Sequence, residues 1–174
     1  MRIARLVASD ASTYREFMLE AYAQAADAFT STAEERALEP LSWWEKRTGG
    51  EGGLSESFGA FHEALMVGTV ALEYSAKPKT RHSAWVIGMY VRPSHRRSGV
   101  AAALIQAAVS AAAARPEIQT LRLTVTEGNE PAIRLYESVG FVAWGTEPHA
   151  IHTKAGFKGK LHMSLILPRA STAA

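Results

Sequence analysis

The sequence contains no cysteine. This absence excludes disulfides, thiolate metal sites and a cysteine nucleophile. The apolar runs are also short, far below the ~20 residues that a membrane-spanning helix needs. The N-terminal segment MRIARLVASD becomes polar at once and lacks the hydrophobic core of a signal peptide. We therefore expect a cytoplasmic protein with no membrane partner.

A large excess of charge of one sign is likewise missing. Lysine and arginine number 19 against 17 acidic residues, for a formal net charge of +2. The one dense basic cluster consists of Arg92, His95, Arg96 and Arg97. A cluster this local does not make the basic surface that nucleic acid needs, so we expect no nucleic-acid partner. His149 and His152 have no acidic partner at ligand spacing, so we expect no metal site.

Length and composition predict one domain. A chain of 174 residues, 47% hydrophobic and 21% charged, can bury a core without cross-links. No internal repeat or low-complexity linker divides the chain, so we expect a single domain over residues 1–174. The tail from Ala170 to Ala174 is predicted to fray.

Hydrophobic periodicity predicts alternating strands and helices. The expected strands cover residues 3–7, 58–62, 65–74, 83–91, 121–125, 141–145 and 161–167. The expected helices are one with its apolar face from Tyr14 to Ala25, one starting at a Ser31–Glu34 capping box and interrupted by Pro40, one over 99–114 and one over 131–139. Gly140 is placed to cap the last of these. This order predicts an α/β fold with helices on both faces of one sheet.

A basic loop joins the strand that ends at Val91 to a helix that begins near Gly99. The first N–H groups of a helix have no internal acceptor and, with the helix dipole, attract anions. Gly99 lets the backbone approach a phosphate closely, and Arg96 and Arg97 add positive charge. The pattern is also typical of a solvated basic turn before an ordinary helix. It is neither a P-loop nor a dinucleotide fingerprint, because the glycines and the Gly-Lys-Ser/Thr of those motifs are missing.

Two segments resemble a known family. Arg96-x-x-Gly99-x-Ala101 resembles the Arg/Gln-x-x-Gly-x-Gly/Ala signature of the GNAT N-acetyltransferases. The segment from Asn129 to Phe141, NEPAIRLYESVGF, resembles the second element of that family. The resemblance implies an α/β fold with a mixed, mostly antiparallel sheet of six to seven strands. It also implies that residues 1–80 mainly form the acceptor side and residues 81–141 the acetyl-CoA-binding core.

The resemblance also implies where acetyl-CoA lies. The pantetheine arm is expected along Met89, Tyr90 and Val91, in a gap beside that strand. The pyrophosphate is expected on the backbone of Arg96, Arg97, Ser98, Gly99, Val100 and Ala101. Asn129, Ala132 and Tyr136 are expected to contact the cofactor from the other side, although helix capping also explains Asn129.

The implied reaction is direct attack of a primary amine on the thioester. Tyr136 is expected to act as general acid toward the leaving thiolate, with the role of a core aromatic as the alternative. A backbone N–H near Met89 or Tyr90 is expected to polarise the carbonyl.

The general base is left open. Family members that resemble the ribosomal-protein alanine acetyltransferases place a Glu five residues before the Asn, where this sequence has Thr124. A threonine cannot serve as that base. Glu73, His82 and Glu127 are the remaining candidates, and a water chain to solvent would also suffice.

The sequence does not name the amine acceptor. Phe29, Trp43, Trp44 and the first two helices fall where the family builds its acceptor pocket, but these aromatics also fit a core or dimer contact. The stretch from Glu147 to Gly156 is expected to form a loop in the last hairpin, close to the acceptor. Polyamines, amino acids, aminoglycoside-like compounds and protein lysines stay open as acceptors, and a homodimer is one option. A non-catalytic acyl-CoA-binding module on the same fold is the alternative function, followed by an unrelated phosphate-binding protein.

Overall fold

Seven strands form one sheet in the computed structural model, which describes residues 1–168. The sheet order is β1-β2-β3-β4-β5-β7-β6. The strands are β1 (Arg2–Arg5), β2 (Ser55–His62), β3 (Leu65–Tyr74), β4 (Ser83–Val91), β5 (Thr120–Thr126), β6 (Val142–Thr153) and β7 (Gly156–Ile166). Every neighbouring pair is antiparallel except β4 and β5, which are parallel. The expected mixed, mostly antiparallel sheet is confirmed, whereas the tail predicted to fray lies outside the described residues.

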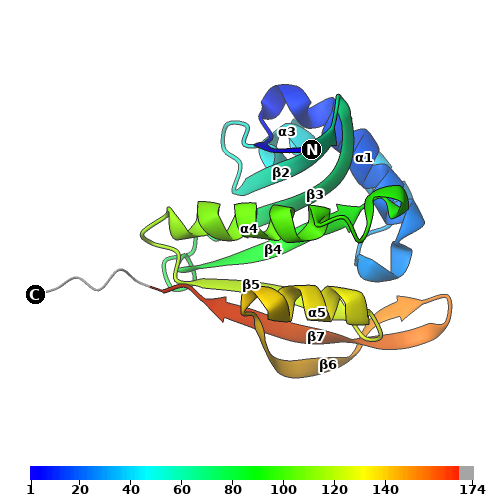
Figure 1. Ribbon diagram of the computed structural model, residues 1–174, viewed down its shortest axis with the longest axis vertical. Coiled ribbons are helices and arrows are strands. Elements are labelled where there is room, and N and C mark those ends of the chain that lie inside the picture. Colours follow the sequence, from blue (N-terminus) through cyan, green and yellow to red (C-terminus); the bar gives the residue numbers. More distant parts are fainter. Residues whose placement is uncertain (169–174) are drawn as a thin grey trace, which may run out of the picture.

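Helices cover both faces of this sheet, as the order of elements predicted (Figure 1). They are α1 (Ala11–Gln24), α2 (Ala33–Ala37), α3 (Leu41–Arg47), α4 (Val100–Ala113) and α5 (Glu130–Val139). The helices α4 and α5 pack on one face, and α1 and α3 pack on the other. The alanine-rich α4 lies very close to β3, where a Cβ added to Gly68 would lie only 3.0 Å from Leu104. Small side chains on the helix and in the strand allow this approach.

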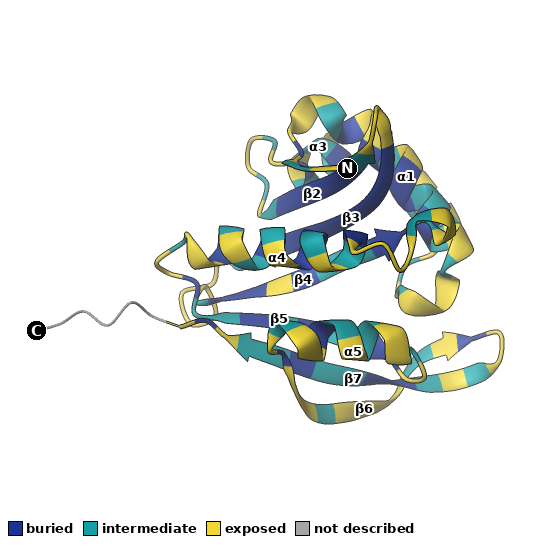
Figure 2. Ribbon diagram, in the orientation of Figure 1, coloured by how far each residue is buried: buried dark blue, intermediate teal, exposed yellow. Residues whose placement is uncertain are grey.

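Each face of the sheet has its own core, and the strands between the helices are buried (Figure 2). The larger core lies under α4 and α5 and includes Leu72, Leu104, Leu121, Leu123 and Met163. The smaller core lies under α1 and α3 and includes Tyr14, Phe17, Met18, Trp44 and Tyr90. Alternating residues of the same strands supply the two cores, because successive side chains of a strand point to opposite faces.

Two predicted boundaries are wrong on the N-terminal side. The capping box uses Thr32 and Glu35 rather than Ser31 and Glu34, with the Glu35 N–H donating to the Thr32 hydroxyl at 3.1 Å. Pro40 does not simply interrupt a helix, because it is the N-terminal cap of α3. A proline at this position is compatible with a helix start, since the first N–H groups have no helical acceptor. The Trp43-Trp44 pair therefore lies inside a helix that the sequence analysis missed.

The last hairpin is longer than predicted. The expected strands were 141–145 and 161–167, but β6 continues to Thr153 and β7 already begins at Gly156. The stretch from Glu147, with His149 and His152, is therefore part of a strand rather than a loop. Pro148 hid this continuation, since a proline has no N–H for a central ladder. It is tolerated because β6 is an edge strand whose pairing is irregular between Glu147 and Ile151.

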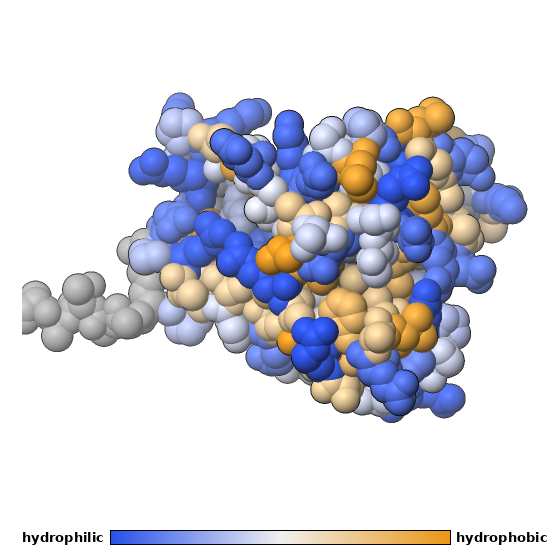
Figure 3. All heavy atoms as spheres, turned by 90° about the horizontal axis from the view of Figure 1, so that it is seen from above, coloured by the Kyte–Doolittle hydropathy of each residue, from blue (hydrophilic) through white to orange (hydrophobic). Residues whose placement is uncertain are grey.

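The surface is polar over most of the face seen from above in Figure 3, with hydrophobic side chains gathered in patches between charged ones. Among the helices in the described part of the chain, none has the length and apolar character to cross a membrane.

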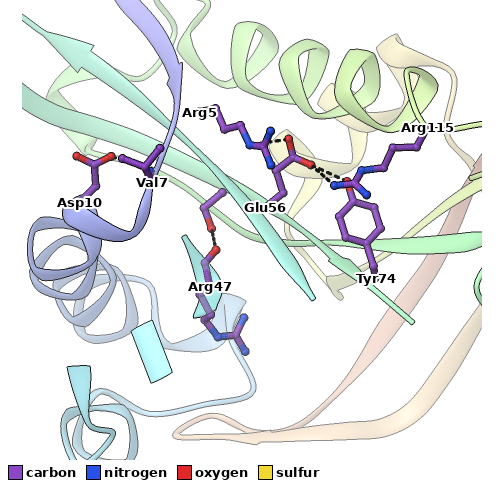
Figure 4. A network of polar contacts seen from close by, with 8 residues as sticks. Arg5, Val7, Asp10, Arg47, Glu56, Tyr74 and Arg115 are labelled. Carbon is purple, nitrogen blue, oxygen red and sulfur yellow. Dashed lines mark hydrogen bonds and ion pairs between the residues drawn. The ribbon is translucent and has the colours of Figure 1, made fainter. Parts of the chain in front are cut away.

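A buried carboxylate ties β1, β2, β3 and the segment after α4 together (Figure 4). Glu56 is only 5% exposed and sits between two guanidinium groups. Its Oε1 lies 3.0 Å from Arg5 Nε, and its Oε2 lies 3.2 Å from Arg115 Nη2. Tyr74 donates its hydroxyl to Oε2 at 2.9 Å. Burial, together with this hydrogen bond, raises the pKa of Tyr74, so the phenol stays a donor.

We expect Glu56→Ala to lower the free energy of unfolding by about 2 kcal/mol, because one buried acceptor serves three donors. Glu56→Gln should cost less, since an amide oxygen still accepts from Tyr74. Chemical denaturation measures both. Glu16→Ala, at an exposed position of α1, is the matched control and should leave stability within about 0.5 kcal/mol. An equal effect of Glu16→Ala and Glu56→Ala would contradict this account.

Candidate functional site

The strands β4 and β5 part after a short paired stretch. They pair only from Ser83 to Trp85 on β4 and from Thr120 to Arg122 on β5. Beyond this stretch a cavity of about 180 Å³ lies between them, and we call it the β4–β5 cavity. Its walls come from residues 86–89 of β4, residues 124–126 of β5, residues 28–30, Asn129, Ala132, Tyr136 and Lys160.

A bulge in β4 shapes one wall of this cavity. The register of β4 against β3 shifts between Thr69 and Ala71, and Gly88 has a φ of 64°. Such an extra residue leaves backbone groups outside the ladder and bends the strand. Glycine is suited to this φ because it has no Cβ. The bulge therefore exposes unpaired backbone of Gly88 and Met89 at the cavity.

Four of the residues expected to bind the cofactor meet in the β4–β5 cavity: Met89, Asn129, Ala132 and Tyr136. Asn129 is also the N-terminal cap of α5, and its Oδ1 accepts the N–H of Ala132 at 3.4 Å. Gly140 ends the same helix with a φ of 103°, as its sequence position predicted. The cap and the glycine fix the length of α5, so Tyr136 is held at a defined place.

Tyr136 is 6% exposed, and its ring packs edge-on against Phe141 with 5.8 Å between the ring centroids. Burial raises the pKa of Tyr136, because the apolar surroundings disfavour a phenolate. The side chain is thus both a core aromatic and a cavity wall. At neutral pH it offers a proton rather than a negative charge.

Tyr90 and Val91 present backbone, not side chains, to the gap beside β4. The Tyr90 ring lies in the core under α1, 5.6 Å from the ring of Phe17, and Val91 lies in the core under α4. Both residues pair with β3 on one side, while the recorded β5 pairing ends earlier, at Trp85. On the other side, the Val91 oxygen accepts the Nε–H of Arg96.

The loop from Arg96 to Ala101 follows the end of β4 and leads into α4. Arg97 and Gly99 both have left-handed backbone, with φ of 59° and 81°. The first helical hydrogen bond runs from the Ala103 N–H to the Gly99 oxygen at 3.0 Å, so the N–H groups of Val100 to Ala102 precede it. Left-handed turns before a helix gather such N–H groups into an anion-binding concavity. A Cβ on Gly99 would meet nothing within 4 Å, so it would project into open space beside the loop.

The arginines near this loop differ in what they contact. Arg96 donates its Nε–H to the Val91 oxygen at 3.0 Å, which anchors the loop to β4. Arg92 forms a bidentate ion pair with Glu20 of α1 and also donates to the Met66 oxygen at 2.8 Å. Arg96 was expected to add positive charge at this loop, but its guanidinium already makes a hydrogen bond within the protein. Arg97 is exposed.

A second cavity, of about 200 Å³, lies on the α1 side of β4, and we call it the α1-side cavity. It shares Phe29, Thr30, Ile87 and Gly88 with the β4–β5 cavity. Its other walls are Tyr14, Met18, Tyr22, Ser31, Arg36, Arg47 and Glu73. The bulge at Gly88 thus borders both cavities, and a Cβ there would lie 3.6 Å from the Tyr14 hydroxyl.

Of the aromatics expected at an acceptor pocket, Phe29 lines both cavities. Trp44 is fully buried and packs edge-on against Tyr14, so it is a core residue. Trp43 stands between two cations, with Arg36 at 4.7 Å and Arg47 at 4.2 Å from its ring centroid. It positions those arginines rather than lining the cavity itself.

The three candidate bases lie in different places. Glu73 lines the α1-side cavity, with its Oε2 3.7 Å from Arg47 Nη2. Glu127 accepts the Gly159 N–H at 3.2 Å and lines a third cavity, which shares Ala28, Thr126 and Asn129 with the β4–β5 cavity. His82 precedes the paired end of β4, and its carbonyl accepts the Gln119 N–H at 2.7 Å. About 20 Å of extended strand separates His82 from Gly88.

Sequence reasoning missed Gly88 and Lys160. A glycine inside an apolar strand is a signal for a bulge or a close backbone approach, and it went unused. Lys160 is buried on β7, where alternation with Leu161 places it on the opposite face from the α4 core. Burial lowers the pKa of Lys160, and the Glu147 carboxylate opposes this effect. No local pattern predicted that this lysine lines the cavity, because its position depends on pairing with Thr126.

A tether closes the β4–β5 cavity from the α1 side. The Thr126 hydroxyl donates to the Asp27 oxygen at 2.6 Å, which holds the turn after α1 against β5. Residues 28–30 therefore reach the cavity. Within residues 1–168, no group of three or more His, Asp or Glu residues is arranged to hold a metal ion.

Solved structures share this fold. An acetyltransferase of the GNAT family from Streptococcus pneumoniae matches with a TM-score of 0.81 and 20% identity, covering 96% of this chain and 99% of that one. YncA from Salmonella typhimurium, a putative acetyltransferase solved with its cofactor acetyl-CoA, gives a TM-score of 0.79, 19% identity and coverage of 100% and 98%. A ribosomal-protein-alanine N-acetyltransferase from Brucella melitensis gives 0.76, 23% identity and coverage of 96% and 100%. Among curated proteins, no sequence matches significantly.

Sequence comparison with family models extends this likeness beyond the fold. The model of the acetyltransferase (GNAT) family matches residues 16–141. That range contains the bulge at Gly88, the loop before α4 and the whole of α5. The chain belongs to the GNAT acetyltransferase family.

Proposed function

We propose that this protein transfers the acetyl group of acetyl-CoA to a primary amine by direct attack of the amine on the thioester. One observation carries the proposal: Tyr136 of α5 and the bulge of β4 line the same cavity, and a second cavity meets it at Gly88. Donor and acceptor can thus approach the bulge from opposite sides. The enzyme's contribution is to hold the two reactants in line.

The donor fits the β4–β5 gap and the loop before α4. The pantetheine arm runs along Met89, Tyr90 and Val91, where the unpaired backbone of the bulge at Gly88 and Met89 offers hydrogen bonds to its amide groups. The N–H groups at the start of α4 and the open space at Gly99 suit a pyrophosphate. Asn129 and Ala132 on α5 form the facing wall.

The reaction needs a proton donor, a proton acceptor and a polarised carbonyl. The amine loses a proton, its lone pair forms the N–C bond, and the C–S bond breaks. Tyr136 gives its proton to the leaving thiolate, and its raised pKa keeps the phenol protonated until that step. An unpaired N–H at Gly88 or Met89 polarises the carbonyl. Glu73 is our choice of base, because it alone of the three candidates lines a cavity that borders Gly88.

We propose that a single domain binds both the donor and the acceptor. Residues 1–80 supply most of the α1-side cavity, which we assign to the acceptor, and residues 81–141 supply most of the donor wall. A cytoplasmic location and a homodimer stay predictions from the sequence.

A thiol-release assay tests the proposed function directly. The chain has no cysteine, so free thiol detected after mixing with acetyl-CoA and a panel of amines comes from CoA alone. Amine-dependent release supports the enzyme. Tight CoA binding without release for any amine would instead support a non-catalytic acyl-CoA-binding module. Thermal stabilisation by ATP or NAD but not by CoA would contradict both.

We expect Gly99→Val to weaken CoA binding by about tenfold or more, because the new side chain projects into the space assigned to the pyrophosphate. The unfavourable φ should also cost about 1 kcal/mol of stability. Gly52→Val is the matched control, since Gly52 has a φ of 71° and equally open surroundings. Calorimetric titration with CoA measures affinity. Equal affinities of the two variants would place the pyrophosphate elsewhere.

We expect Tyr136→Phe to lower kcat by about a hundredfold, because the thiolate loses its proton donor. CoA affinity should change little, since the ring remains. Tyr74→Phe removes another buried hydroxyl, in the Glu56 network, and should retain kcat. Steady-state kinetics and CoA titration separate the effects. A collapse of CoA affinity in Tyr136→Phe, with kcat unchanged, would make Tyr136 a structural residue.

A further inference from the structure

The α1-side cavity is lined by two arginines and one glutamate. Arg36 comes from α2, Arg47 from the end of α3 and Glu73 from the end of β3. The cavity is small, about 200 Å³, so a molecule inside it lies within one Debye length, about 8 Å, of all three charges. The charges of these three side chains therefore influence which molecules bind in the cavity.

Of the two arginines, Arg47 has the less neutralised guanidinium. Its one recorded ion pair within residues 1–168 is the 3.7 Å contact with Glu73, whose side chain is 44% exposed. Its guanidinium stacks on Trp43, which fixes its position without neutralising it. Figure 4 shows the Arg47 side chain directed away from the Glu56 network, while its backbone carbonyl accepts the Ser57 hydroxyl at 2.7 Å. The stacking on Trp43 and the hydrogen bond from Ser57 therefore hold the Arg47 guanidinium at the α1-side cavity.

Arg36 supports the same positive wall but is held more firmly. Its Nη2 donates to the Ser31 hydroxyl at 2.7 Å, and its Nη1 lies 3.4 Å from the Glu39 carboxylate. Its Nε–H is buried and has no acceptor within residues 1–168. These contacts hold the charged guanidinium of Arg36 next to Ser31. The cavity wall is therefore positive on the side of α2 and α3, and among residues 1–168 Glu73 is the one acidic side chain that lines it.

Resting on the proposed function, we propose that the acceptor is a small amine that also carries a carboxylate, an amino-acid-like zwitterion. The carboxylate binds Arg47, with Arg36 adding to the positive field, and the ammonium faces Glu73 and Gly88. Glu73 takes one proton from the ammonium, and the nitrogen attacks the thioester carbon. The C–S bond breaks, Tyr136 protonates the departing thiolate, and the second proton lost by the nitrogen returns to the Tyr136 oxygen through water. Polyamines and aminoglycoside-like compounds bring only positive charge, which the two guanidinium groups disfavour.

The size of the cavity supports the same substrate class. The cavity volume of about 200 Å³ lies below the roughly 300–1,000 Å³ of pockets that hold drug-sized ligands, so it favours a small acceptor. A free amino acid with a short side chain fills such a space. The apolar walls from Met18, Phe29 and Ile87 suit an apolar or thioether side chain better than a charged one.

The thiol-release assay with matched acceptors tests this inference. The probes are the free α-amino acids, the same amino acids as C-terminal amides, and spermidine. We expect at least one free amino acid to have a kcat/KM more than about tenfold above its own amide and above spermidine, as a charge-assisted contact predicts. Turnover of amides or spermidine as efficient as that of every acid would overturn the substrate class and leave the proposed function standing. Absence of turnover with any amine would contradict the proposed function and this inference with it.

Variants of Arg47 test whether this residue causes the preference for free amino acids over their amides. Arg47→Met should raise KM for the best amino acid about tenfold to a hundredfold and leave KM for its amide nearly unchanged. Arg47→Lys keeps the charge and should restore part of the preference. Arg81→Met, at an exposed arginine away from both cavities, is the control. Unchanged CoA affinity and thermal stability exclude a folding effect. If Arg47→Met raised KM equally for the free amino acid and its amide, Arg47 would have only a structural role.

Discussion

The separation of β4 from β5 is the constraint on which the rest of the site depends. Two parallel neighbours normally stay hydrogen-bonded along their length, but here the pairing stops at Trp85 and Arg122. The bulge at Gly88 adds a residue to β4 relative to β3 and bends the strand. Unpaired backbone is costly when buried, so the gap has to be filled by groups that can hydrogen-bond. A pantetheine arm, with its amides, is such a partner.

The sequence predicted the part of the site that depends on local backbone. Gly99 at the start of α4, Asn129 and Gly140 at the two ends of α5, and the position of Tyr136 on that helix all follow from short-range rules of capping and periodicity. The bounds of β4 and the layer order were likewise predictable, because strong alternation and apolar runs are local signals. Gly88 carried a readable signal too, since a glycine inside a buried strand requires a reason.

The acceptor side was less predictable, and particular residues show why. Trp43 and Trp44 are neighbours in sequence, yet Trp44 enters the core while Trp43 stacks between two arginines. Which of them does which follows from the start of α3 at Pro40, a residue that ordinarily marks the end of a helix. Arg36, Arg47 and Glu73 come from three different elements, and no spacing in the sequence brings them together. The same holds for Lys160, whose position depends on the β5–β7 register.

This difference has a consequence for how the two halves of the site can change. In the proposed function, donor binding relies largely on backbone groups at the bulge and at the start of α4, which side-chain substitutions alter only when they add bulk. The proposed acceptor wall relies on side chains of α2 and α3, where Arg36 and Arg47 both stack on the ring of Trp43. A substitution at Arg36 or Arg47 therefore changes the charge of the α1-side cavity without moving β4. The fold can keep one donor and exchange its acceptor, because the two cavities share only the neighbourhood of Gly88 and Phe29.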